Sequence, residues 1–160
     1  MNKALFLDRD GVINRERGKY TYRSGDFEIL PDVIEALRLA KEKGYLVIGI
    51  SNQGGIAKGL FSKEDVERLH LKLNEILHEN GVFLDELYYC PHHDEVGKCI
   101  CRKPDVLMLE KAIARFNIDS QSSVMIGDSQ RDVEAAEKAG VRGVLVESNA
   151  GILDIVKGLE

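Results

Sequence analysis

Short apolar runs alternate with helical patterns along the chain, and this alternation constrains the fold more than any other feature. Five runs have the length and continuous apolar character of buried strands, at 4–8, 45–51, 84–90, 123–127 and 142–147. Amphipathic patterns between and after them predict helices at 31–43, 63–80, 105–116, 130–139 and 150–158. Strands that are buried on both faces and joined by helices are typical of parallel sheets. The sequence therefore predicts an α/β fold, a doubly wound parallel sheet with helices on both faces.

One predicted helix shows its boundaries in the sequence. Ser62 is a typical N-cap because Asp65 stands three positions further on, and Gly81 marks the end of the helix. Apolar residues recur between them at helical spacing. His70 and His78 are assigned to the side away from this apolar stripe, so both are expected at the surface.

Composition limits the kinds of partner that this chain can have. Its 160 residues, 44% hydrophobic and 31% charged, suit one globular domain over 1–160. The net charge of −5 argues against a nucleic acid bound through a basic surface. No apolar run reaches membrane-spanning length, and no targeting segment is recognisable. We expect a cytoplasmic protein with neither a membrane nor a nucleic-acid partner.

Polar and charged residues follow the predicted strands at the points where these end. Asp8 and Asp10 follow the first strand, Ser51 the second, Lys103 the third and Asp128 the fourth. Each of them alone has a plain structural explanation, such as a turn or a cap. The carboxyl ends of parallel strands meet at one edge of the sheet, where such folds bind ligands. The joint occurrence of these residues at one edge therefore favours a functional site.

The two acids after the first strand carry like charges two positions apart, which disfavours ionisation of both. A divalent cation would offset this repulsion, and carboxylate oxygens are ligands that Mg²⁺ prefers. The predicted magnesium ligands are Asp8, Asp10 and Asp128. Lys103 and the main-chain amides after Ser51 would hold the oxygens of a phosphoryl group.

A second metal site is predicted in the segment CPHHDEVGKCICRKP. Three thiolates and one imidazole close a tetrahedral zinc shell and leave no position for water. The candidate ligands are Cys90, His92, Cys99 and Cys101. Three clustered cysteines make a poor disulfide framework, although they could also be small buried hydrophobes, and His93 could replace His92. We expect a structural Zn²⁺ that orders the loop 90–101 beside the predicted phosphoryl site.

Four stretches of the chain, FLDRDG, ISNQGG, CRKP and IGDSQRD, occur in this order. They resemble the four motifs of the phosphatases of the haloacid dehalogenase (HAD) superfamily, and the resemblance covers nearly the whole chain. No segment is long enough for a separate cap domain, so the resemblance is to the capless members. It implies a Mg²⁺-dependent phosphoric monoester hydrolase that acts on a small phosphorylated metabolite.

The resemblance also implies roles for the motif residues. Asp8 would be the nucleophile that forms an aspartyl-phosphate, and Asp10 would be the general acid and base. Asp128 would bind Mg²⁺ together with Asp8 and the main-chain carbonyl of Asp10. Asp132 would support the site from behind these ligands. The residues implied to steady the phosphoryl group are Ser51 and Lys103.

The cysteine segment narrows the resemblance to two related groups of phosphatases. One hydrolyses the C7 phosphate of D-glycero-D-manno-heptose 1,7-bisphosphate, and the other hydrolyses histidinol phosphate in histidine synthesis. The stretches SNQGGIAKGLFS and YYCPHH are more similar to the heptose group. In that group the stretch matching 16–19 flanks the substrate. The implied substrate contacts are Ser51, Asn52, Gln53, Gly54, Arg102 and Lys103.

Two features depart from the heptose pattern. Only six residues separate His92 from Cys99, which is nearer to the histidinol group. Ser129 also stands where the heptose enzymes often have a lysine that would help to bind phosphate. Histidinol phosphate is therefore the alternative substrate.

Two other classes of protein place similar residues at strand ends. A phospho-accepting receiver domain also combines acids, a hydroxyl and a lysine, but it needs neither the second acid at position 10 nor a zinc loop. A zinc-organised binding module without catalysis would not need all four motifs. Because a cap domain often mediates dimerisation and none is expected here, we expect a monomer.

Overall fold

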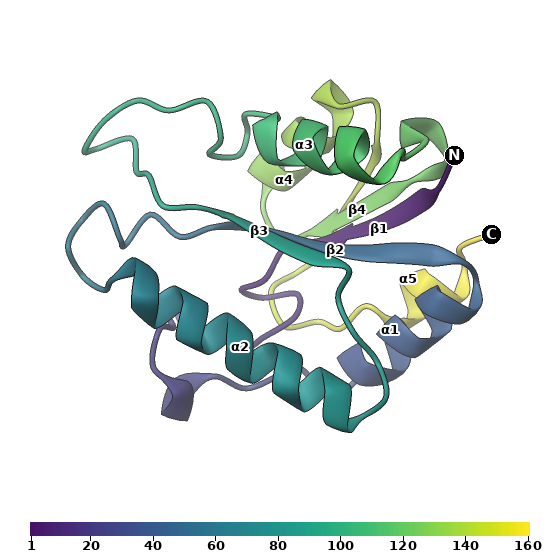
Figure 1. The fold of residues 1–160 in the computed structure, drawn as a ribbon, viewed down its shortest axis with the longest axis horizontal. Helices are drawn as coiled ribbons and strands as arrows, with labels where there is room; N and C mark the ends of the chain where they lie inside the picture. Colours follow the sequence, from purple (N-terminus) through teal and green to yellow (C-terminus); the bar gives the residue numbers. More distant parts are fainter.

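The computed structural model describes residues 1–160 and contains a five-stranded sheet with the order β3-β2-β1-β4-β5, in which all neighbours are parallel. The strands are β1 (Lys3–Leu7), β2 (Tyr45–Asn52), β3 (Glu86–Cys90), β4 (Val124–Gly127) and β5 (Arg142–Leu145). The chain begins at the centre of the sheet, builds one edge, then crosses to build the other (Figure 1). The predicted doubly wound α/β fold is confirmed.

Helices cover both faces of the sheet. The helices are α1 (Val33–Glu42), α2 (Lys63–Glu79), α3 (Leu107–Phe116), α4 (Gln130–Lys138) and α5 (Leu153–Lys157), with short 3₁₀ turns at Ser24–Asp26 and Ser120–Ser122. Helices α3 and α4 lie on one face, and α1, α2 and α5 lie on the other (Figure 1). This division is what a chain that crosses to both edges of a parallel sheet requires.

The central strand shows why both faces are covered. Leu5 and Leu7 belong to the apolar cluster that contains α1, α2 and α5, whereas Ala4 and Phe6 belong to the cluster under α3 and α4. All four are fully buried. Alternate side chains of a strand point to opposite faces, so an uninterrupted apolar run fits a strand between two helical layers.

The predicted boundaries are confirmed to within a few residues, with one wrong placement. Ser62 and Asp65 form the expected capping box, because the Ser62 hydroxyl accepts from the Asp65 amide and the Asp65 carboxylate accepts from the Ser62 amide. His78 is exposed, as expected. His70 is not: it is only 8% exposed and lies one helical turn from Val66 on the buried side of α2.

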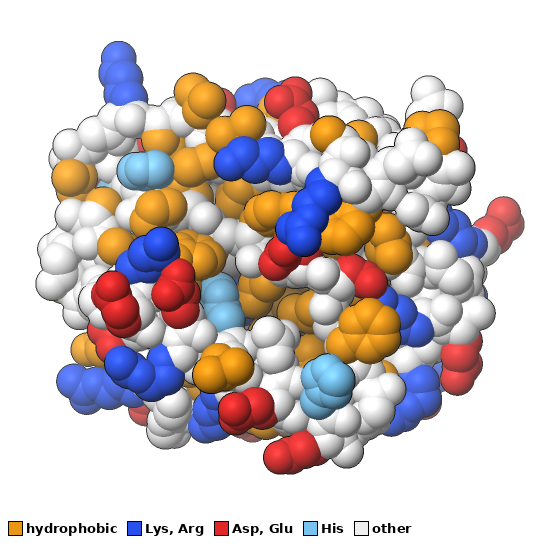
Figure 2. Space-filling model, in the orientation of Figure 1, with side chains coloured by type: hydrophobic (Ala, Val, Ile, Leu, Met, Phe, Trp, Pro, Cys, Tyr) orange, Lys and Arg blue, Asp and Glu red, His pale blue; other side chains and the backbone are white.

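The carboxyl ends of the strands lie at one end of the sheet, and both chain termini lie at the other (Figure 1). The loops after β1, β2, β3 and β4 therefore surround one edge. On the face seen in Figure 2, acidic and basic side chains are interspersed rather than separated by sign. No helix combines the length and the apolar character needed to cross a membrane.

Candidate active site and adjacent metal cluster

A cleft of about 540 Å³ opens at the carboxyl ends of the strands. Its volume is ordinary for a small-molecule site, but its lining is far more polar than usual. Five carboxylates contribute to it, from Asp8, Asp10, Glu16, Asp128 and Asp132. The basic side chains along it are Lys19, Arg102, Lys103 and Arg131, and His93 also contributes. Such a lining suits an anionic ligand held together with a cation.

Asp8 and Lys103 form the centre of the cleft. The Lys103 Nζ lies 2.9 Å from Asp8 Oδ1 and 2.6 Å from Asp132 Oδ1, and it also donates to the Ile50 carbonyl at 2.7 Å. Burial raises the pKa of Asp8 well above its usual value, and although Lys103 opposes this effect, the nearby carboxylates add to it. Lys103 itself is buried, yet the negative charges of Asp8 and Asp132 raise its pKa. A further cation would be needed to keep every carboxylate ionised.

Asp10 is held differently from Asp8. Its Oδ1 accepts from Arg9 Nη2 at 2.7 Å and from Asn14 Nδ2 at 3.0 Å, and its Oδ2 accepts from Gln53 Nε2 at 3.0 Å. Burial alone would raise the pKa of Asp10, but the Arg9 charge and these hydrogen bonds lower it below its usual value. The carboxylate is therefore fixed in one orientation at the edge of the cleft.

The loop after β2 approaches the same carboxylates. Gln53 also donates to the Ser51 hydroxyl at 2.8 Å, so its amide joins Ser51 to Asp10. Asn52 exchanges hydrogen bonds with the Lys103 main chain, accepting from its N–H at 3.0 Å and donating to its carbonyl at 3.1 Å. Asn52 and Gly54 line the cleft, whereas the buried Ser51 and Gln53 lie behind its lining.

The loop after β4 contributes Asp128 and Asp132. Asp132 caps α4, because its Oδ2 accepts from the Ser129 amide at 3.1 Å while its Oδ1 faces Lys103. Asp128 Oδ2 accepts from the Ser148 hydroxyl at 2.5 Å. Gly11 allows this approach: it has φ +86°, and a Cβ there would lie 2.1 Å from Asp128 Oδ2. A glycine is required at this position for both reasons.

The acids that the structure brings together fit a divalent cation. One carboxylate oxygen each from Asp8, Asp128 and Asp132 lies within 4.8 Å of the others, and such a hard oxygen set suits Mg²⁺. The Asp10 carboxylate is instead taken up by Arg9, Asn14 and Gln53. This engagement leaves only the main chain of Asp10 for a metal, as the motif resemblance implies.

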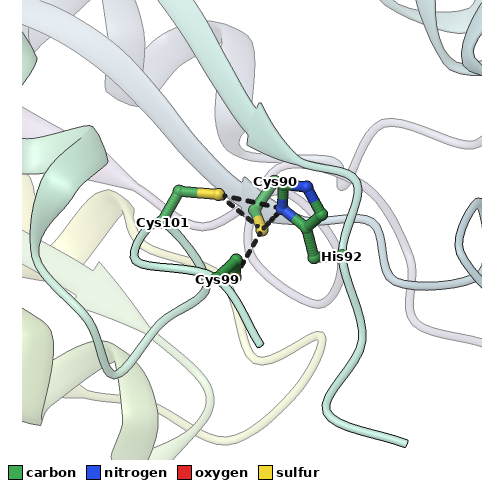
Figure 3. A group of neighbouring side chains, drawn as sticks. All are labelled: Cys90, His92, Cys99 and Cys101. Atoms are coloured by element: carbon green, nitrogen blue, oxygen red, sulfur yellow. Dashed lines mark hydrogen bonds between the residues drawn. The ribbon is translucent and has the colours of Figure 1, made fainter. Parts of the chain in front are cut away.

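The second cluster lies where β3 ends, and Figure 3 shows its four side chains pointing toward one another. The Sγ atoms of Cys90 and Cys99 are 3.8 Å apart, and His92 Nδ1 lies 3.2 Å from Cys101 Sγ. A tetrahedron with zinc–sulfur bonds of about 2.3 Å has edges of about 3.8 Å. The cysteines are unpaired, so the cluster fits zinc, and His92 rather than His93 faces it.

This cluster is linked directly to the cleft. The Arg102 amide donates to Cys99 Sγ at 3.4 Å, and Arg102 Nη1 donates to the His92 carbonyl at 3.2 Å. His93 turns the other way and lines the cleft beside Gly54. A fixed Cys/His cluster therefore positions Arg102 and, one residue further, Lys103.

Several lining residues carried no signal in the sequence. Tyr20, Thr21 and Arg131 line the cleft but stand outside the motif positions that were assigned a role. Lys19 and Glu16 were expected only to flank the substrate, and both contribute to the lining. Nothing in the local pattern of residues 15–23 predicts that this irregular segment folds over the carboxyl end of the sheet.

Comparison with known families agrees with this geometry. Residues 100–153 match the family model described as HAD-hydrolase-like. The chain is 43% identical over 157 residues to D-glycero-beta-D-manno-heptose-1,7-bisphosphate 7-phosphatase of Haemophilus ducreyi, covering 94% of this chain and 86% of that protein. It is 40% identical over 157 residues to D-glycero-D-manno-heptose-1,7-bisphosphate 7-phosphatase of Chlorobaculum tepidum, covering 91% and 79%.

A solved structure is similar over the same length. The chain superposes with a TM-score of 0.85 and 31% identity on D,D-heptose 1,7-bisphosphate phosphatase from B. bronchiseptica complexed with magnesium and phosphate, covering 99% of this chain and 88% of that one. The chain belongs to the haloacid dehalogenase superfamily of phosphatases. Its activity is therefore the hydrolysis of a phosphate ester.

Proposed function

We propose that this protein removes the C7 phosphate of D-glycero-D-manno-heptose 1,7-bisphosphate. The observation that carries the proposal is the 43% identity to a 7-phosphatase over 94% of the chain, combined with a cleft that contains the four motifs. The basic residues Lys19, Arg102 and Arg131 along this cleft suit a substrate with two phosphates. The relatives are not all named for the same anomer: the one from Haemophilus ducreyi is named for the beta anomer, and a 39% identical one from Photorhabdus laumondii is named for the alpha anomer.

In the first half-reaction Asp8 is the nucleophile. A carboxylate oxygen of Asp8 attacks phosphorus, the bond from phosphorus to the C7 oxygen breaks, and an aspartyl-phosphate forms. Asp10 gives its proton to the departing C7 oxygen, so that the sugar leaves as a neutral alcohol. The negative charge of the incoming phosphate favours the protonated form of Asp10 that this step requires.

In the second half-reaction Asp10 acts as a base. It takes a proton from water, whose oxygen attacks phosphorus, and the bond to Asp8 breaks. Inorganic phosphate leaves, and Asp8 returns to its carboxylate form. Lys103 contacts Asp8 at 2.9 Å, so its ammonium stands beside the oxygens on which charge develops in both steps.

We propose that Asp8, Asp128 and the main-chain carbonyl of Asp10 hold Mg²⁺. When bound, the ion neutralises the negative charge of the phosphoryl group and of the carboxylates around it. Asp132 holds Lys103 from behind, at 2.6 Å. The proposed substrate contacts are residues 51–54, Arg102 and Lys103, with Ser51 and Gln53 acting from beneath the cleft lining.

We propose that Cys90, His92, Cys99 and Cys101 hold a structural Zn²⁺. All four protein ligands are present, so no position is left for catalysis at this ion. Its role is mechanical, because Arg102 is bonded both to Cys99 and to the His92 carbonyl.

The test is a side-by-side measurement of kcat/KM for both anomers of the heptose bisphosphate and for histidinol phosphate, with Mg²⁺ present. We expect the bisphosphate to be preferred by about 100-fold or more, near 2.7 kcal/mol of transition-state discrimination. The specific reason to include histidinol phosphate is the spacing of only six residues between His92 and Cys99. A preference for histidinol phosphate would overturn the proposal and make that short loop the informative feature.

A further inference from the structure

We propose that Arg9 and His70 form a buried support that positions the carboxylate of Asp10 for proton transfer. This inference rests on the proposed function, in which Asp10 is the general acid and base. Neither residue lines the cleft, so both would act through Asp10 rather than on the substrate. They are positioning residues.

Arg9 is a fully buried cation in direct contact with Asp10. Its side chain is 0% exposed, and its Nη2 lies 2.7 Å from Asp10 Oδ1. The same Nη2 donates to the Thr21 carbonyl at 2.9 Å, and the guanidinium lies 5.9 Å from the centre of the Phe27 ring. Burying a charge is costly unless it is paired and hydrogen-bonded. Arg9 is such a buried charge, and its partner Asp10 is the proposed general acid and base.

The orientation of the guanidinium depends on a small number of contacts. Arg9 Nε is buried and has no hydrogen-bond partner. The remaining terminal nitrogen, Nη1, lies 3.3 Å from His70 Nε2. His70 is therefore the contact that fixes the second arm of the planar group, while Asp10 and Thr21 fix the first.

His70 can act only as an acceptor here. Arginine has donors and no acceptor, so His70 Nε2 must carry a lone pair and the ring must be neutral. Burial and the Arg9 charge lower the pKa of His70 to about 3, which agrees with that state. Tyr89 packs against the ring edge-on at 5.6 Å, so α2 and β3 together hold the imidazole in place.

The support also connects Asp10 to the segment that borders the cleft. Thr21 is buried, and its carbonyl receives Arg9 while its neighbour Tyr20 lines the cleft. The Arg9 guanidinium therefore contacts Asp10, helix α2 through His70, and the segment beside the cleft through the Thr21 carbonyl. A lysine has a single nitrogen and cannot make these contacts in one plane.

The test uses the dependence on the leaving group, which general disruption of the fold would not change. An acid that protonates the leaving oxygen matters for an alkyl phosphate and much less for p-nitrophenyl phosphate, whose leaving group is stable as an anion. The quantity compared is kcat/KM, since it reports steps only up to the formation of the aspartyl-phosphate. Arg9→Lys, His70→Leu, His70→Gln and Asp10→Asn are measured on both substrates.

We expect Arg9→Lys to lower kcat/KM for the heptose bisphosphate on the order of 100-fold, and for p-nitrophenyl phosphate about tenfold or less. His70→Leu should show the same unequal loss at smaller size, and His70→Gln, which keeps an acceptor, should restore most of it. The matched controls are Arg68→Lys and His78→Gln, exposed residues of the same helix, which should leave both values unchanged.

Two results separate the possible failures. If Asp10→Asn shows the unequal loss and Arg9→Lys loses activity equally on both substrates, the positioning role is wrong. If Asp10→Asn itself shows no unequal loss, then the acid role in the proposed function fails. Should Arg9→Lys not fold, the contrast between His70→Leu and His70→Gln decides, and equal activity of those two variants would overturn the proposal.

Discussion

At the scale of single residues, the proposed mechanism depends on Asp8, a carboxylate that the fold alone does not favour as an anion. The Asp8 side chain is only 13% exposed and lies among other acids, and Lys103 is the only cation within bonding distance of it. An amide in its place would keep the shape and remove the repulsion. We expect Asp8→Asn to lower kcat on the order of 10³-fold or more without lowering the thermal unfolding temperature in the absence of Mg²⁺.

Phosphate release and thermal unfolding measure the two parts of this prediction. Asp154→Asn is the control, since that side chain is fully exposed and distant in sequence from the motifs. Turnover near that of the wild type would rule out Asp8 as the nucleophile. A large loss of stability would contradict the statement that its charge is unfavourable in the folded protein.

His70 gives a pH-dependent prediction at the same scale. Its pKa is about 3 in the folded chain against 6.5 for the free side chain, so the unfolded chain holds an extra proton within this window. Neutral His70 therefore makes its full contribution to the free energy of unfolding above pH 6.5. This contribution decreases as the pH falls, by up to about 1.4 kcal/mol per pH unit.

Urea titrations between pH 7 and pH 4.5 would measure this effect. His70→Gln should show a shallower fall of stability with decreasing pH than the wild type, and His78→Gln should show the wild-type slope. Parallel slopes for His70→Gln and the wild type would mean that the folded protein accepts the proton at His70.

At the scale of elements, the loop between β3 and α3 joins the Cys/His cluster, the proposed zinc site, to the cleft. The adjacent histidines are divided between the two, because His92 faces the cysteines and His93 lines the cleft. The same substitution at each histidine therefore compares a residue that faces the cysteines with a neighbour that does not. We expect His92→Gln to lose zinc from a level of about one ion per chain, to unfold about 5 °C lower or more, and to raise KM because Arg102 loses its support.

Zinc analysis of protein purified without chelators checks this prediction. His93→Gln should retain zinc and the unfolding temperature of the wild type, whatever its effect on KM. Zinc retained in His92→Gln but lost in His93→Gln would show that His93 is the ligand instead of His92. Wild-type protein without zinc would contradict the proposed zinc site.

The elements were predictable where a local signal existed. The Ser62–Asp65 capping box and the apolar run of β1 are such signals, and the spacing of the cysteines indicated that Cys90, His92, Cys99 and Cys101 gather. The burial of His70 was missed because its ring is hydrogen-bonded to Arg9, which lies 61 positions away in the sequence. Tyr20 was missed for a similar reason, since an irregular segment with no periodicity brings it to the cleft. Arg131 stands at the start of α4, inside a motif in which no role was assigned to it.

At the scale of the whole molecule, the sheet places motifs that are far apart in the sequence at one edge, and the chain adds no separate cap over them. The border of the cleft comes instead from short loops, among them the segment with Lys19 and Tyr20 and the loop with His93 and Arg102. An open, strongly polar cleft of about 540 Å³ suits a small bisphosphate better than a bulky or apolar ester. The central claim is that this cleft removes the C7 phosphate of the proposed substrate and leaves the C1 phosphate in place.

Phosphorus NMR of the heptose bisphosphate during turnover tests the central claim most directly. The account predicts that the signal of the C7 ester disappears and inorganic phosphate appears, while the signal of the anomeric C1 phosphate remains. Loss of the C1 signal first, or a spectrum unchanged by enzyme that hydrolyses p-nitrophenyl phosphate, would contradict it.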